Sequence, residues 1–214
     1  MLFSKNFNVM KKTTVLLAIV LVIISQNSNG QETFTSYDNT YAKKTYDIQL
    51  SLKDAEKFTL FIDAMSLDDL HEQGGLMVDE KKYQGFIDAL NEAKLKYQEW
   101  EKTAKDNNVK ELDKEMLIKS KVAGYFLYGG DWHFQYIVNL TFDFKILESD
   151  GEIKYLLIVR SGKMQSSSNQ YMDVDGVVLV FSSVEEIQEF LDTISLQKIN
   201  EFRNKPKAED LFKD

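Results

Sequence analysis

The stretch YGGDWHFQYIVNLTFDFKIL, residues 128–147, decides the fold class. From Trp132 onward a large apolar side chain occupies every second position, which is the period of a strand with one buried face. Polar residues, including His133, Gln135 and Asn139, fill most of the positions between. The predicted strand is unusually long. Its apolar face consists of Trp132, Phe134, Tyr136, Val138, Leu140, Phe142, Phe144 and Ile146.

The residues before this strand, 116–128, alternate in the same way and predict a hairpin. Its loop length follows from register, because a slip of one residue moves every side chain to the other face. A two-residue loop would place Lys119 and Lys121 on the apolar face, where unpaired lysines are costly. We therefore predict a three-residue loop, Gly129–Asp131, with His133 on the polar face. The expected pairs include Trp132 with Tyr128, Phe134 with Phe126, Val138 with Val122, Phe142 with Ile118, and Phe144 with Met116.

Further alternating segments extend this sheet. Residues 46–52 and 58–64 predict a second hairpin, in which Leu52, Leu50 and Ile48 face Phe58, Leu60 and Ile62. The turn signal Asp150-Gly151 brings residues 152–160 back onto the long strand, with Ile146 opposite Tyr155 and Phe144 opposite Leu157. The run VVLVF, residues 177–181, is apolar on both faces and predicts an interior or covered strand. Strands joined by tight hairpins are antiparallel.

Two amphipathic helices are available to cover the sheet. Asp79 is a good N-cap for the first, whose apolar stripe consists of Phe86, Leu90, Ala93, Tyr97, Trp100 and Ala104. Ser183 and Glu186 form a capping box for the second, whose stripe begins at Ile187. We read the first stripe as packing on the sheet, and its spacing also allows a self-association seam. The expected state is a monomer or a weak dimer.

These elements predict a single α+β domain. Its twisted antiparallel sheet has about six strands, arranged as a hairpin and then a four-strand meander. A long helix and a C-terminal helix cover one face, because the apolar face of a sheet must be buried. A strongly curled, half-barrel version is the alternative, since the strand at 132–147 is long.

A short helix is expected between the first hairpin and the long helix. Ser66 and Asp69 resemble its start, and the pair Gly74-Gly75 resembles its stop, because glycine accepts the left-handed C′ conformation. His71 would lie in the last turn of this helix, where the helix dipole favours positive charge. This structural role is our interpretation of His71.

The first thirty residues have the layout of a secretory signal peptide. Three lysines precede the apolar run VLLAIVLVII, residues 15–24, and small residues follow. Ten apolar residues are too few for a membrane-spanning helix, so we predict cleavage before Gln31 and no stable anchor afterwards. Translation starts at Met1 or at Met10. The predicted division is a signal peptide over 1–30, a flexible lead-in over 31–44, the domain over 45–203 and a charged tail over 204–214.

Charge and composition narrow the classes of partner. The chain has a formal net charge of −8, and removal of the three leader lysines leaves 23 basic against 34 acidic residues, or −11. This acidity and the absence of a basic patch argue against nucleic-acid binding. The chain has no cysteine, so an exported domain of this size depends on its core rather than on disulfides. The lysine- and asparagine-rich composition looks bacterial.

Two groups of residues are candidates for a site. The polar loop after residue 160 is the better one, since loops on a rigid sheet often carry binding groups. Arg160, Lys163, Gln165, Asn169 and Tyr171 could recognise a polar ligand or a partner there. His71, Asp131 and His133 are weak metal candidates, which converge only if the short helix abuts the hairpin tip. The sequence shows no cofactor-binding motif, and we expect no cofactor.

The sequence favours a non-enzymatic exported protein, periplasmic or secreted, that binds an unknown protein or small ligand. No nucleophile elbow, zinc-protease motif or phosphate loop is present in the sequence. One alternative is a carrier of a small apolar ligand in a pocket between the curved sheet and the helices. Large core aromatics that fail to fill that space would distinguish it. The other alternative is a hydrolase with an unrecognised acidic site.

Overall fold

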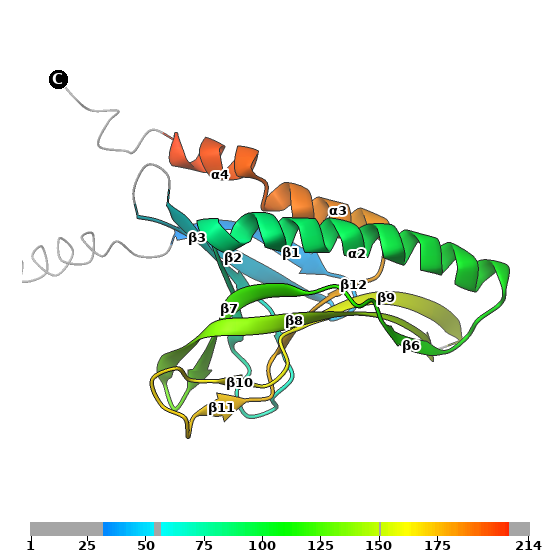
Figure 1. Ribbon diagram of the computed structural model, residues 1–214, viewed down its shortest axis with the longest axis horizontal. Helices are drawn as coiled ribbons and strands as arrows, with labels where there is room; N and C mark the ends of the chain where they lie inside the picture. The colour runs from blue at the N-terminus through cyan, green and yellow to red at the C-terminus, as the bar shows by residue number, and fades with distance from the viewer. Residues whose placement is uncertain (1–31, 54–56, 150, 206–214) are drawn as a thin grey trace, which may run out of the picture. The chain divides into compact units, whose positions relative to one another are not determined.

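The structure is a computed structural model that describes residues 32–53, 57–149 and 151–205. The described chain forms an antiparallel sheet with helices on one side, which confirms the α+β class (Figure 1). The long helix α2 (Glu80–Asp106) runs along the sheet, with α3 (Val184–Thr193) beside it and α4 (Leu196–Arg203) after that. The proposed leader, most of the charged tail and Asp150 of the predicted turn lie outside the described residues.

The sheet contains more strands than the sequence predicts. Its hydrogen-bonded order is β1 (Glu32–Asn39), β2 (Lys44–Leu52), β3 (Phe58–Asp63), β5 (Gly74–Asp79), β7 (Ser120–Tyr128), β8 (Asp131–Ser149), β9 (Glu152–Arg160) and β12 (Val177–Phe181). The short β6 (Leu112–Glu115) pairs with β8, and β10 (Met164–Gln165) pairs with β11 (Asp173–Val174). The four-strand meander β7-β8-β9-β12 is confirmed.

The sheet is strongly curled. The two-residue strand β4 (Met65–Ser66) follows β3 after a single residue, and it pairs with β12 at the far end of the strand order. β12, the last strand of the order above, therefore pairs with β4, the short strand that directly follows β3. This topology agrees with the half-barrel alternative rather than with an open sheet.

Two predicted hairpin registers are confirmed. In β2 and β3, Leu52 faces Phe58, Leu50 faces Leu60, and Ile48 faces Ile62. In β8 and β9, Ile146 faces Tyr155, Phe144 faces Leu157, and Phe142 faces Val159. In both hairpins the alternation together with the position of the turn specifies one register, which is why these pairs could be predicted.

The flexible lead-in over 31–44 is wrong for most of its length. Residues 32–39 form β1, which pairs with β2 over seven residue pairs. Tyr37 anchors the strand, because its buried ring stacks on Tyr46 and its hydroxyl donates a 2.9 Å hydrogen bond to the carbonyl of Asp63. A mostly polar strand at a sheet edge carries little periodic signal, so its sequence resembled a loop.

The short helix over 66–75 is also wrong. Gly74 and Gly75 do not end a helix. They lie in β5, where neighbouring parts of the chain pack closely against the backbone. A Cβ atom at Gly75 would meet the carbonyl oxygen of Ile62 and the ring of Tyr125. His71 does not cap a helix, since residues 67–73 form a non-helical connection between β4 and β5.

The YGGDWH hairpin tip is confirmed, but its three-residue loop is wrong. The loop has two residues, Gly129 and Gly130, with φ values of 62° and 93°, which suit a two-residue hairpin turn. The register then shifts between Val122 and Gly124, where β7 has one residue and β8 has two, Tyr136 and Ile137. This bulge restores the predicted pair of Val122 with Val138 and keeps Lys121 exposed opposite Asn139.

Beyond the bulge, the side chains of the hairpin tip point to the faces opposite to those predicted. There Trp132 faces Leu127 and His133 faces Phe126, so the expected pairs of Trp132 with Tyr128 and Phe134 with Phe126 are wrong. The strand expected to begin at residue 116 begins only at Ser120, because residues 116–119, with Leu117 at a φ of 59°, are not in a strand. The residues just before them form β6 instead. As a result Phe144 faces Lys114 of β6 rather than Met116.

The helices cover the apolar face as predicted. Asp79 caps α2 by accepting from the backbone N–H groups of Lys81 and Lys82. Tyr97 is buried against Phe144, and its hydroxyl lies 3.0 Å from the carbonyl oxygens of both Tyr155 and Ser182. The expected C-terminal helix is bent into α3 and α4, because Ser195 starts a second helix as its N-cap.

Candidate functional site at the distal end of the sheet

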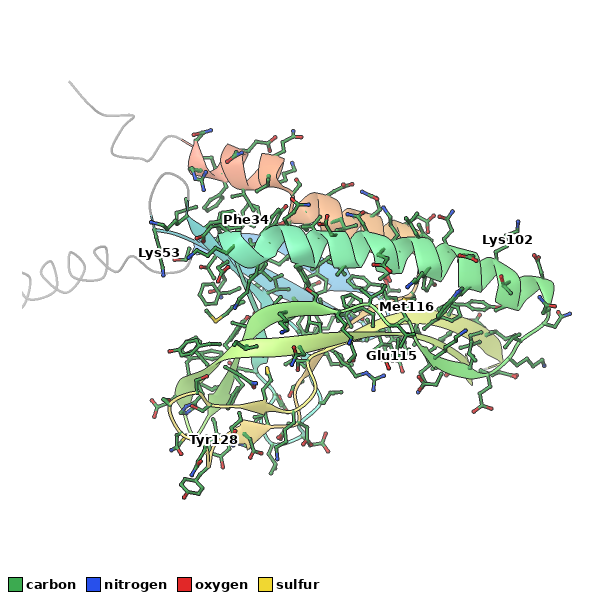
Figure 2. The ribbon with its side chains drawn as sticks, in the orientation of Figure 1. Phe34, Lys53, Lys102, Glu115, Met116 and Tyr128 are labelled. Atoms are coloured by element: carbon green, nitrogen blue, oxygen red, sulfur yellow. The ribbon has the colours of Figure 1, made fainter. Side chains whose placement is uncertain are left out.

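Three segments that are far apart in sequence meet at the end of the sheet away from the helices. They are residues 67–73, residues 126–137 at the β7–β8 tip, and residues 161–176, which include β10 and β11. We call these three segments the distal end. Figure 1 shows the β7–β8 tip together with β10 and β11 on the side opposite α3 and α4, and Figure 2 shows Tyr128 in the same region.

Backbone hydrogen bonds fix the three segments to one another. The N–H of Leu127 donates to the carbonyl of Gln73 over 2.9 Å, and the N–H of Leu67 donates to the carbonyl of Gly176 over the same distance. The N–H of Ser167 donates to the carbonyl of Phe134 over 2.8 Å. Ser167 also accepts at its hydroxyl from the N–H of Tyr136. The loop after β9 thus covers a part of the β8 edge that β9 does not reach.

Both histidines lie against the ring of Tyr128. The His71 ring stacks on the Tyr128 ring, with centroids 4.3 Å apart and an interplanar angle of 10°. The His133 ring meets Tyr128 edge-on at 6.3 Å and stacks on Phe126 at 5.7 Å. His133 therefore packs beside the buried Phe126, so its predicted place on a polar face is wrong.

Asp68 holds His71 in this position. The carboxylate oxygen Oδ1 of Asp68 lies 3.0 Å from Nδ1 of His71, and it accepts from the backbone N–H groups of Leu70 and His71. Burial alone would raise the pKa of Asp68, but these hydrogen bonds and the nearby His71 bring the pKa below its usual value. This contact between Nδ1 and the carboxylate orients the His71 ring that stacks on Tyr128.

The metal candidates do not form a recognisable metal site. His71 and His133 approach the same tyrosine, but the ring of Tyr128 lies against both. Among the described residues, no group of three or more histidine, aspartate or glutamate side chains is arranged to hold a metal ion. We therefore assign the two histidines to packing of the distal end.

The five polar candidates are placed differently. Arg160 remains in β9 and pairs with Asp143 over 2.9 Å, whereas Lys163 pairs with Asp173 over 2.8 Å. Gln165 donates to the carbonyl of Gln170, and Asn169 accepts from the N–H of Tyr171. Four of the five thus support the loop or the sheet through their polar groups. Lys163 and Gln165 are exposed as well, but Tyr171 is the candidate whose side chain makes no such contact in the described structure, and 83 % of its surface is exposed.

The distal end carries a concentration of exposed apolar side chains. Among the described residues, twelve large hydrophobic side chains are exposed, and six of them lie in these three segments. The segments make up only about a fifth of the described residues. Exposure ranges from 44 % at Leu67 to 87 % at Leu70. The six residues are Leu67, Leu70, Trp132, Tyr136, Ile137 and Tyr171.

Two of these residues, Trp132 and Tyr136, were predicted to lie on the buried apolar face. Trp132 and Tyr136 continue the alternation of the long strand, and only the bulge brings Tyr136 and Ile137 to the surface side by side. Bulges often occur beside functional sites, where they redirect a side chain. A bulge leaves no reliable mark in the sequence, so this part of the candidate site was missed.

An aromatic row crosses the sheet face that the helices leave uncovered. Tyr125 contacts Phe61 on one side and Trp132 on the other, at centroid distances of 5.8 Å and 5.6 Å. The Tyr125 hydroxyl donates to a carboxylate oxygen of Asp63. Burial and the neighbouring Asp63 raise the pKa of Tyr125 well above its usual value, so the hydroxyl stays protonated. This row joins the distal end to the middle of the sheet.

Asp63 gives this row a dependence on pH. Burial raises the pKa of its carboxyl, and the hydrogen bond from Tyr125 only partly offsets that effect. A carboxyl whose pKa is higher in the folded state stabilises the fold below its unfolded-state pKa, about 4, and this stabilisation is lost as pH rises through the folded pKa. The fold therefore favours the protonated form of Asp63.

The Asp63→Asn variant tests this dependence. The asparagine keeps an acceptor for Tyr125 but does not titrate. We therefore expect the variant to become more stable relative to wild type, in free energy of unfolding, as the pH rises from about 3 to about 7. Urea denaturation at several pH values measures the shift. Asp106→Asn, at an exposed position on α2, is the matched control. A pH-independent difference for Asp63→Asn would contradict the prediction.

The space between α2 and the sheet is filled by side chains. Phe86, Tyr97, Phe142 and Phe144 are all fully buried there or in the adjoining core. A hollow of about 430 Å³ lies instead on the surface over β6 and β8, lined by residues 110–113 and 145–148. Its walls carry lysines and carboxylates, which do not suit a purely apolar ligand.

Comparison of the chain with protein-family models, with curated proteins and with solved structures finds no match. Within the part of the chain that the structure describes, no helix has the combination of length and apolarity needed to cross a membrane.

Proposed function

We propose that this chain is an exported bacterial protein whose folded domain binds another macromolecule through its distal end. The observation that carries the proposal is the gathering of exposed apolar side chains on three segments fixed to one another. Exposed apolar patches bordered by polar residues are typical of interaction sites. Trp and Tyr are favoured at such sites because their rings bury much area with little loss of side-chain freedom.

The packed core favours surface binding over the carrier alternative. The sequence left that alternative to be decided by whether the core aromatics fill the space under the helices, and Phe86, Tyr97 and Phe144 are buried there without exposed surface. Native mass spectrometry tests the carrier directly. A mass excess that is lost on denaturation would favour a carried ligand, and a bare polypeptide mass would favour the surface.

Site-specific photo-crosslinking tests the proposed surface. A crosslinking amino acid is placed at Tyr136 or Tyr171, and at Leu95 of α2 as a control. Tyr136 and Leu95 have matched exposure, 66 % and 64 %. In cells that express the full chain, we expect the same adducts from both distal positions and none from Leu95. Equal adducts at all three positions, or none at Tyr136 and Tyr171, would refute the proposal.

The same cells test export. N-terminal sequencing of the protein recovered outside the cytoplasm is expected to begin at Gln31, after loss of the leader. Replacing Leu17 with arginine interrupts the apolar run 15–24 and should retain the chain in the cytoplasm. Recovery of an uncut chain from outside the cytoplasm would contradict the predicted cleavage. Recovery only in the cytoplasm would contradict export itself.

A further inference from the structure

We propose that the distal end docks a cationic segment of a partner protein, rich in arginine or lysine. This inference rests on the proposed function and names the chemistry of its partner. It follows from three features of the distal end: its charge, the absence of free cations of its own, and the availability of its aromatic rings.

The distal end is strongly acidic. Its three segments contain six carboxylates and one lysine, a formal net charge of −5. Asp69, Glu72 and Asp131 are exposed, and within the described structure none of them forms an ion pair or a side-chain hydrogen bond. Charges of one sign on a small area attract partners of opposite charge and speed their association.

The cations nearest this surface already have partners. Lys163 lies within it and pairs with Asp173 over 2.8 Å. Lys82 of α2 reaches its border, where the ammonium group donates to the carbonyl of Tyr136 over 3.0 Å and lies 4.0 Å from Asp79. Asp173 is thus already paired, whereas Asp69, Glu72 and Asp131 have no cationic side chain beside them in the described structure and remain available to an incoming cation.

The exposed rings provide a second interaction for a cationic side chain. The fold itself uses cation–π contacts: Lys114 lies 4.5 Å from the Trp100 ring, and Lys105 lies 5.2 Å from the Tyr155 ring. Within the described residues, no lysine or arginine lies over the rings of Trp132, Tyr136 or Tyr171. Arginine suits such a site best, since it stacks on a ring while it hydrogen-bonds a carboxylate.

These features favour a protein segment over a polysaccharide. An aromatic platform alone would suit a neutral glycan, but a neutral glycan gains nothing from exposed, unpaired carboxylates. An anionic polymer would be repelled by them. Exposed apolar residues such as Leu67 and Leu70 can pack against the aliphatic side chains of a peptide, and sugars have no such side chains.

Fluorescence anisotropy with a labelled synthetic peptide tests the inference. In the probe arginine alternates with leucine, and glutamine or glutamate replaces arginine in two comparison peptides. We expect the full chain to bind the arginine peptide at least tenfold more tightly than the glutamine peptide, and not to bind the glutamate peptide. Affinity should fall as salt is added, because the attraction is electrostatic.

Two matched variants locate the binding. The triple variant Asp69→Asn, Glu72→Gln, Asp131→Asn removes three charges from the distal end. The control variant Glu99→Gln, Asp106→Asn, Glu189→Gln removes three from exposed positions on α2 and α3. We expect at least a tenfold loss of peptide affinity for the first variant and less than a twofold loss for the second. Equal losses would mean non-specific attraction to an acidic protein and would overturn the inference.

The outcomes separate this inference from the proposed function. Distal crosslinks in cells without arginine-peptide binding would refute the cationic partner and leave the binding surface in place. Loss of both would refute the surface as well. Binding of a neutral oligosaccharide that Trp132→Ala abolishes and the triple charge variant leaves unchanged would identify a glycan instead and overturn the inference.

Discussion

Replacing Gly75 with alanine is expected to lower the free energy of unfolding by about 3 kcal/mol or more, although the change adds one methyl group. Gly75 lies between Asp63 of β3 and Tyr125 of β7. The added Cβ would collide with the carbonyl oxygen of Ile62 and with the hydroxyl end of the Tyr125 ring. The carbonyl belongs to a paired strand and cannot turn aside, so the strands must separate or Tyr125 must leave Asp63.

Gly85→Ala is the matched control. Gly85 is exposed in the second turn of α2, and no atom beyond the nearby helix backbone lies within 4 Å of the Cβ that alanine would add there. Alanine favours a helix over glycine by about 1 kcal/mol, so the same substitution should stabilise the protein. Urea denaturation of both variants measures whether each substitution raises or lowers the free energy of unfolding. A loss below about 1 kcal/mol for Gly75→Ala would contradict the close approach at Gly75.

The Gly74-Gly75 pair shows why part of the fold could not be predicted from the sequence. Glycine ends helices and also permits close packing between strands, and these uses look alike in a single sequence. The choice depends on Tyr125, fifty residues further along the chain, whose ring covers Gly75. The β2–β3 and β8–β9 hairpins depend only on residues close together in the sequence, and their registers were predicted correctly.

The hairpin tip shows a different limit. Lys119 and Lys121 stay out of the core, as predicted, and both are exposed. The fold achieves this with a bulge at Tyr136 and Ile137 rather than with a longer loop, because two glycines with positive φ already form a tight turn. Both solutions pair Val122 with Val138 just below the bulge. Above the bulge, at the distal end where the proposed function lies, they place opposite faces of the strands outward.

The candidate site was only partly predictable for the same reason. The loop with Tyr171 and the histidines were selected from the sequence as separate possibilities. Their meeting depends on β5 pairing with β7, which brings residues 67–73 beside the tip. Loss of the predicted helix is what makes this pairing possible, since Gly74 can then face Phe126. Exposure of Leu70, in the connection before β5, follows from the same change.

Phe144→Ala and Trp132→Ala should separate stability from binding, although both aromatic residues lie on β8. Phe144 is fully buried against Tyr97, Trp100 and Tyr155, so its truncation is expected to cost about 3–5 kcal/mol. Trp132 is 48 % exposed and contacts Tyr125 at one side, so its truncation should cost about 1 kcal/mol or less. Urea denaturation measures both losses.

Binding is expected to follow the opposite order. Trp132→Ala should bind the arginine peptide more weakly even when all of the variant protein is folded. Phe144→Ala should keep its affinity for the peptide at temperatures where it remains folded. The contrast has a physical reason: one strand passes from beneath α2 to the distal end, and the bulge at Tyr136 changes which of its faces meets solvent. If both variants lost affinity only in proportion to their unfolded fraction, Trp132 would be part of the fold alone, and the binding surface would have to lie elsewhere.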